Sequence, residues 1–167
     1  HRNRKAIPGD EGRGEMILTK DNYHSIESNR EFMSVSQYKG YLECESRQQA
    51  IVDGIFVQEV SPAMLAGSMF HAWSDGTLPE FKISHPEMFT KAGELKSDFK
   101  LVEKMIESVK SDPFCMFVLE GKKEQIFTSE LFGTKWKVMM DVYNPEAGRY
   151  VEIKTTKSIS GLTWNDD

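Results

Sequence analysis

Hydrophobic residues in the first two-thirds of the chain recur every three or four positions, a spacing that predicts helices. The pattern covers residues 34–54, 61–76, 97–110 and 112–121, while Pro and Gly interrupt an irregular stretch at 77–93. A Ser-x-x-Gln capping box opens the first helix, and a Ser-Pro pair opens the second. This part of the chain is therefore expected to be mainly helical.

In the last third the pattern changes to alternating apolar and polar residues, which is typical of strands. Strands are predicted at 124–131, 135–143 and 149–155, joined by short turns at 132–134 and 144–148. Consecutive strands with short turns pair as an antiparallel meander. We therefore expect an α+β (mixed α/β) fold, with helices flanking a mostly antiparallel sheet of three strands.

Length and composition bound the class of protein. The chain has 167 residues, of which 39% are hydrophobic and 28% are charged, as in a single soluble domain. No apolar run approaches the roughly 18 residues of a membrane span. Two cysteines are too few for a zinc or iron–sulfur site held by four thiolates. We expect a cytoplasmic protein with two free thiols.

The two ends of the chain depart from this pattern. Residues 1–15 are rich in Gly and charge, and are expected to be a flexible arm or a remnant of cloning. Residues 16–167 are expected to form one domain. The sequence stops twelve residues after the third predicted strand, where a covering helix would normally follow. The domain is therefore expected to be truncated at its C-terminal end.

Two acids and a lysine in the predicted sheet form a candidate metal centre. Glu152 and Lys154 are two residues apart, so they share one face of a strand, and Asp141 lies on the preceding strand. Carboxylates and the main-chain carbonyl of Ile153 would supply the oxygen ligands that Mg²⁺ or Mn²⁺ prefers. Lys154 could then orient or deprotonate an attacking water. The pattern indicates phosphodiester hydrolysis; an ordinary surface ion pair is the alternative.

Lysines beside these acids are candidate phosphate contacts. Lys137 and Lys157 flank the acids in sequence, and with Lys135 and Lys154 they form a basic cluster. A local cluster can bind DNA phosphates even though the net charge of the chain is −5. A solvated surface face is the alternative interpretation.

Three pieces of sequence stand in order: Gly67-Ser-Met-Phe-His71-Ala-Trp73, Lys137-Val-Met-Met-Asp141 downstream of Glu124 and Gly133, and Val151-Glu-Ile-Lys-Thr155. Together they resemble the PD-(D/E)xK nuclease superfamily in its RecB-type and lambda-exonuclease-like branch. The similarity is greatest to phage and prophage exonuclease VIII-type (RecE-like) proteins, and it spans roughly residues 16–160. It implies a restriction-endonuclease-like core.

The resemblance also implies roles for single residues. Asp141 and Glu152 match the metal-binding acids of the family, and Lys154 matches its catalytic lysine. His71 matches a helical histidine that contributes to the metal centre in RecB-type members; a packed or exposed side chain is the alternative. Glu124 matches a supporting acid, with Glu130 as a weaker candidate on the same strand, and an exposed edge charge is again the alternative.

The activity implied by the resemblance is that of a Mg²⁺-dependent DNA exonuclease. Such enzymes degrade the ends of linear double-stranded DNA and leave single strands for recombination. Relatives of this type assemble as homo-oligomeric rings around DNA and work beside a single-strand annealing recombinase. Two alternatives stay open: an inactive nuclease-fold module that binds DNA or another protein, and an endonuclease or resolvase of the same fold.

Overall fold

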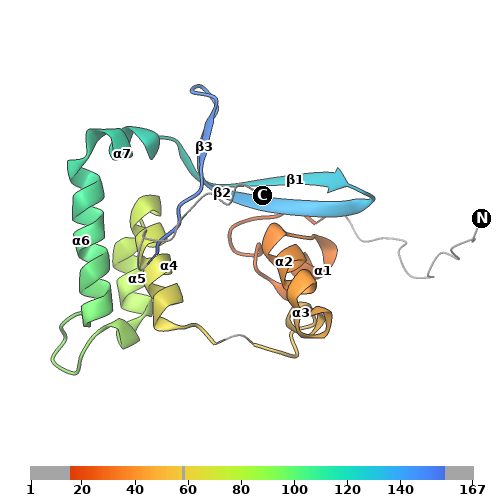
Figure 1. Cartoon of the computed structure of the whole chain (residues 1–167), viewed down its shortest axis with the longest axis horizontal. Coiled ribbons are helices and arrows are strands. Elements are labelled where there is room, and N and C mark those ends of the chain that lie inside the picture. Colours follow the sequence, from red (N-terminus) through yellow and green to blue (C-terminus); the bar gives the residue numbers. More distant parts are fainter. Residues whose placement is uncertain (1–15, 58, 157–167) are drawn as a thin grey trace, which may run out of the picture. The chain divides into compact units, whose positions relative to one another are not determined.

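The computed structural model describes residues 16–57 and 59–156. These residues divide into two compact units. The first combines the chain up to Phe56 with Thr128–Lys137, and the second combines Val57–Phe127 with the chain from Val138 onward. Figure 1 labels the elements of both. None of the helices in the described ranges is long and apolar enough to cross a membrane.

The first unit contains helices α1 (Ile26–Glu31), α2 (Val35–Glu43) and α3 (Glu45–Val52). The predicted capping box is confirmed: the Gln37 amide N–H bonds the Ser34 hydroxyl, and the Gln37 side chain accepts from the Ser34 amide. The prediction of one helix over 34–54 is wrong, because Cys44 is extended (φ −161°, ψ 101°) and separates two helices. The break lets α3 fold back onto α2, where the Gln48 side chain lies against Gly40.

The tip of a β-hairpin completes this unit. Met33 pairs in parallel with Trp136, through hydrogen bonds from Met33 N to Lys135 O and from Lys137 N to Met33 O, both 2.8 Å. The buried side chains include Tyr23, Phe32 and Val52, but also the polar residues Ser28, Gln37, Gln48 and Lys137. The interior of the first unit therefore depends on hydrogen bonds between its polar groups.

The second unit contains α4 (Pro62–Asp75), α5 (Leu78–Ser84), the 3₁₀ helix η1 (Pro86–Met88), α6 (Ser97–Ser111) and α7 (Pro113–Val118). Helices α4, α6 and α7 agree with the predicted ranges, and the Ser61 hydroxyl caps α4 as expected. The prediction of irregular structure over 77–93 is wrong for α5 and η1. Both are too short for periodicity to show, and the Pro residues that suggested breaks occupy their first turns.

The sheet has the order β1-β2-β3, with strands at Lys122–Leu131, Thr134–Asn144 and Arg149–Val151. A two-residue turn with positive φ at Phe132 (55°) and Gly133 (70°) joins β1 to β2. Strand β3 pairs antiparallel with β2, with Val142 opposite Val151. This confirms the α+β class and the three-stranded antiparallel sheet.

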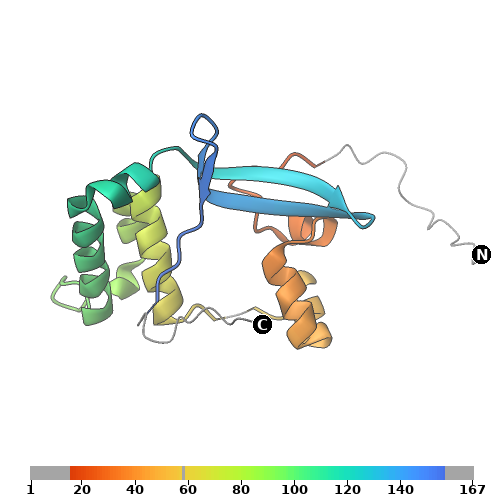
Figure 2. The same ribbon diagram turned by 45° about the horizontal axis from the view of Figure 1, so that its top comes forward.

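The core of the second unit lies between its helices and the base of the sheet. Helices α4 and α6 run side by side in both views (Figures 1 and 2). Their apolar faces meet Val142 of β2 and Ile153, in a cluster that comprises Leu65, Met69, Phe70, Met88, Phe99, Val102 and Ile106. Gly121 directly precedes β1 and has φ 147°, and a Cβ there would lie 2.7 Å from the Tyr143 carbonyl oxygen. Only glycine therefore fits where the chain enters the sheet.

Candidate active site

Helix α4 positions His71. The helix is fixed at both ends, by the Ser61 cap and by Gly76, which is left-handed with φ 83°. Gly67 lies one turn before His71, and a Cβ added there would lie 3.1 Å from Thr155 Oγ1. Glycine at this position lets the segment after β3 lie directly on α4. The Gly-x-x-x-His spacing thus brings that segment to the helix that carries the histidine.

Asp141 on β2 joins these two elements. Its side chain is 16% exposed, and Oδ1 lies 3.3 Å from His71 Nδ1. Its other oxygen, Oδ2, accepts a hydrogen bond of 2.6 Å from the backbone amide of Ile153. One carboxylate therefore links α4, β2 and the segment that contains Glu152 and Lys154.

Both members of the Asp141–His71 pair have shifted pKa values. The hydrogen bond to Asp141 raises the pKa of His71 above its usual value, despite the opposing effect of burial. Burial alone would raise the pKa of Asp141, but hydrogen bonds from His71 and from the Ile153 amide outweigh it and lower that pKa. Both shifts favour a protonated imidazole beside an ionised carboxylate.

Glu152 and Lys154 lie together on the exposed side of the chain, where their side chains form a salt bridge, while Ile153 between them is buried. The predicted alternation is thus observed, but the predicted strand over 149–155 is too long, since β3 ends at Val151. The strand ends there because the Ile153 amide donates its hydrogen bond to the Asp141 side chain and not to the backbone of a neighbouring strand.

The two candidate supporting acids, Glu124 and Glu130, both lie on β1. Glu124 is partly buried on β1 with φ 49°, and Glu130 is exposed on the part of β1 that belongs to the first unit. Lys157 lies outside the described residues.

The prediction of Lys137 as a phosphate contact is wrong, because this residue is only 3% exposed. Its ammonium donates to the Tyr23 carbonyl, the Ser28 hydroxyl and Asn29 Oδ1. Burial lowers the pKa of Lys137 to about 8.

Sequence reasoning missed Lys123. Its ammonium donates to the Leu119 carbonyl (2.6 Å) and to the Ser74 hydroxyl (3.4 Å), so it ties the end of α7 to the end of α4. Burial lowers the pKa of Lys123, against the attraction of Asp75 and Asp141. Because nothing in its local sequence distinguishes it from the exposed Lys122 beside it, only the fold reveals this role.

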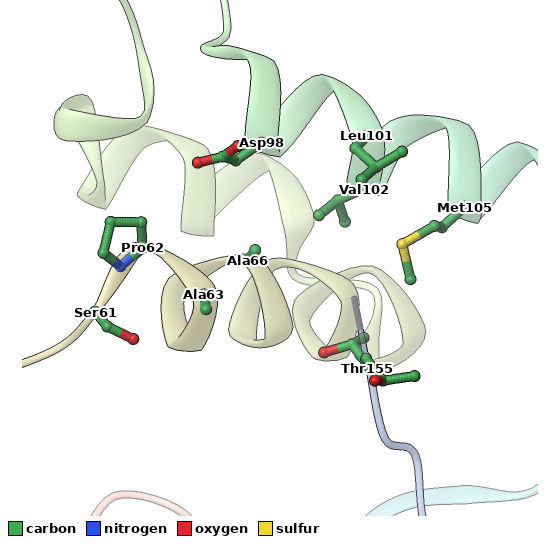
Figure 3. A pocket seen from close by; sticks show the side chains of 10 residues that line it. Ser61, Pro62, Ala63, Ala66, Asp98, Leu101, Val102, Met105 and Thr155 are labelled. Atoms are coloured by element: carbon green, nitrogen blue, oxygen red, sulfur yellow. The ribbon is translucent and has the colours of Figure 1, made fainter. Parts of the chain in front are cut away.

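Two hollows adjoin the Glu152–Thr155 segment. One, of about 490 Å³, lies between the start of α4 and α6 and is lined by Ser61, Ala66, Asp98, Met105 and Thr155 (Figure 3). The other is a largely apolar groove of about 950 Å³ lined by Phe70, Phe114, Leu119, Ile153 and Lys154, among others. Lys154 therefore lies at a concave surface of the second unit.

The donor chemistry at Asp141 fits a divalent cation. Asp141 and Glu152 offer carboxylate oxygens, and Asp141 holds His71 as carboxylates hold metal-binding histidines in other proteins. Within residues 16–57 and 59–156, however, no three His, Cys, Asp or Glu side chains are grouped as a metal-binding set. Glu152 is half-exposed and held only by a surface ion pair worth roughly 0–1 kcal/mol, so its carboxylate can turn at little cost.

Comparisons with known proteins show the family and the fold of the chain. A crystal structure from Eubacterium rectale, described as a "putative exonuclease", superimposes with a TM-score of 0.76 at 42% sequence identity. The match covers 78% of this chain and 52% of the other, so the chain spans about half the length of that relative. A search of curated proteins found no match to this chain. The sequence model of the PDDEXK-like domain of unknown function (DUF3799) matches residues 34–167, and the chain belongs to this family.

Proposed function

We propose that this chain is the nuclease domain of a Mg²⁺-dependent exonuclease that degrades linear double-stranded DNA from its ends. One observation carries the proposal: Asp141 bonds both His71 and the backbone of the Glu152–Lys154 segment. Membership of a PDDEXK-like family and the similarity to the Eubacterium rectale protein support the same class of reaction.

Asp141 and Glu152 would hold the cation, with the Ile153 carbonyl as a further donor. His71 would be another donor once its imidazole has released its proton. A bound Mg²⁺ would neutralise charge on the phosphoryl group and lower the pKa of a water. Lys154, whose side chain is 76% exposed, would orient the attacking water and stabilise developing negative charge. The hydrogen bond from Ile153 N to Asp141 holds the backbone next to this lysine against the acid.

The first test is digestion of linear duplex DNA in Mg²⁺ by the unmodified chain, Asp141→Ala and Lys154→Ala. We expect each substitution to lower the single-turnover rate by at least about 100-fold, because both groups act on the reacting phosphate. Lys122→Ala is the matched control, since it removes an exposed lysine from β1 and should leave the rate unchanged. Full digestion by both site variants would refute the assignment.

An inactive DNA-binding module is a second candidate, favoured by the absence of a preformed three-ligand cluster among the described residues. Titration calorimetry with Mn²⁺ separates the two functions. Millimolar or tighter binding that disappears in Asp141→Ala supports the nuclease, and no heat with either protein supports the module. Circular duplex as substrate distinguishes an endonuclease or resolvase, which would cut it, from an exonuclease, which would not.

We further propose that the chain is related to RecB-type, RecE-like exonucleases, and that the single strands it produces serve recombination. A ring of identical subunits around DNA and a single-strand annealing partner would follow from that relationship. A ring would also suit a chain of net charge −5, since positive charge need only line the channel. Sedimentation of the longest expressible form, with and without duplex DNA, tests the assembly.

A further inference from the structure

Helix α6 presents one face to the core and another to the groove beside Lys154. The core face is formed by Phe99, Val102 and Ile106. The other face carries the side chains at positions 101, 104, 105 and 108, which are three or four residues apart and therefore form one stripe. This stripe lines the groove of about 950 Å³, together with α7 and the Ile153–Thr155 segment.

The apolar side chains of the groove are left in contact with water. Phe114 is 71% exposed and Leu101 is 56% exposed. Helix α7, which carries Phe114, has the sequence Pro-Phe-Cys-Met-Phe-Val, yet none of its six residues is buried. Apolar surface left open in a groove is typical of a site that binds a ligand or a partner.

The charged side chains that line the groove are both lysines, Lys104 and Lys154. No carboxylate of the described residues lines it, although the chain has 26 Asp and Glu against 21 Lys and Arg. The acids Glu103 and Glu107 on the same helix are ion-paired with other lysines outside the groove. The occupant of the groove is therefore expected to combine negative charge with apolar surface.

Lys154 decides between the two kinds of occupant that fit this description, an acidic peptide and a DNA strand. It belongs both to the groove and to the candidate active site, where it pairs with Glu152. Under the proposed function Lys154 acts on the reacting phosphate, so the nucleotides next to that phosphate lie at the groove. Bases in a duplex are stacked on one another, so only an unpaired strand could offer their faces to apolar side chains.

We propose that the groove holds an unpaired strand of the DNA substrate, with bases against Phe114 and Leu101 and a phosphate at Lys104. The inference rests on the proposed nuclease function, because that function brings the reacting phosphate to Lys154. Lys104 is available for the contact, since it forms no ion pair within residues 16–57 and 59–156. Lysine is a common donor to phosphate oxygens, and an aromatic ring can stack on a base of any sequence.

Affinity for a single-stranded oligonucleotide tests the proposal, with Ca²⁺ in place of Mg²⁺ so that the DNA is bound without being cut. We expect Phe114→Ser to raise the dissociation constant about tenfold, because it removes a ring on which a base stacks. Lys104→Met should raise it about threefold and lower the slope of log affinity against log salt by about 0.7. Tyr150→Ser and Lys110→Met are the matched controls, since both residues are exposed and lie outside the groove.

The thiol of Cys115 gives a direct probe, because it lines the groove. The chain has two cysteines, so Cys44→Ser leaves Cys115 as its single thiol. We expect saturating oligonucleotide to slow the alkylation of Cys115 by N-ethylmaleimide about tenfold, because the bound strand covers the sulfur. Polyglutamate at the same concentration should leave the rate unchanged.

Each other outcome overturns the proposal. Unchanged affinity in Phe114→Ser, or an unprotected Cys115, would show that the strand lies elsewhere. Equal protection by polyglutamate would assign the groove to an acidic peptide. An equal loss of affinity for relaxed circular duplex, which has no end to open, would show that the strand need not be unpaired. The proposed function fails separately, if Asp141→Ala still digests DNA, whatever the groove variants do.

Discussion

Asp141 is the residue on which the candidate site depends, because its two oxygens do different things. One holds the imidazole of His71, and the other takes the amide of Ile153. Sequence reasoning placed Asp141 beside Glu152 as a metal-binding acid. The structure adds that Asp141 also holds the backbone that carries Glu152 and Lys154. Replacing Asp141 would therefore remove one candidate metal ligand and also release the segment that carries the other.

The titration of His71 tests this arrangement. We expect the pKa of His71 to lie above the ordinary value of 6.5, and to fall in Asp141→Asn, which keeps the shape of the side chain without its charge. Folding stability from this histidine should be fully present below pH 6.5 and should be lost as the pH rises through the raised pKa. NMR titration of the imidazole protons measures the pKa of His71 in the unmodified chain and in Asp141→Asn.

At the level of elements, the site depends on how closely α4 and the segment after β3 approach. The approach requires that Gly67 have no side chain and that β3 end at Val151. Neither condition follows from helix or strand propensity. Glycine lowers the stability of a helix interior, so its presence in α4 is explained by packing against Thr155.

Gly67→Val should therefore affect activity more than folding. A branched side chain would push against Thr155 Oγ1 and displace Lys154 from Asp141, and misplacement by about 1 Å can cost on the order of 100-fold in rate. We expect at least a tenfold fall in the single-turnover rate. Ser68→Val, an exposed position on the same helix, is the matched control and should change little. Equal rates for the two variants would show that the close approach is irrelevant to the chemistry.

At the level of the whole molecule, the two units differ in how they are stabilised. The second has an apolar core around Met69, Met88 and Val142, whereas the first buries a lysine with three neutral oxygen acceptors. The folding stability of the first unit is therefore expected to change with pH in the alkaline range.

Fold class, helix caps and the hairpin were predictable from sequence. The division into two units was not, since residues 128–137 join the N-terminal helices from far away in the chain.

The buried Lys137 makes the folding stability depend on pH, and this dependence can be measured. Its pKa is about 8 in the folded chain and 10.5 in an unfolded one, so unfolding takes up a proton between these values and stability rises with pH there. The gain from pH 8 to pH 10 should be about 2 kcal/mol. Urea unfolding followed by tryptophan fluorescence measures it, relative to Lys137→Met, in which the gain should be absent. Lys135→Met is the control, because that lysine is paired with Glu31 at the surface.

The sequence by itself determined the class of fold, the capped helix with Gly67 and His71, and the acids and lysine at 141, 152 and 154. These are local patterns of spacing and residue type, and local physics decides them. Tertiary structure alone decided that Lys137 is buried, that β3 stops early and that Lys123 joins two helix ends. Each of these depends on partners distant in the chain, which no window of sequence contains.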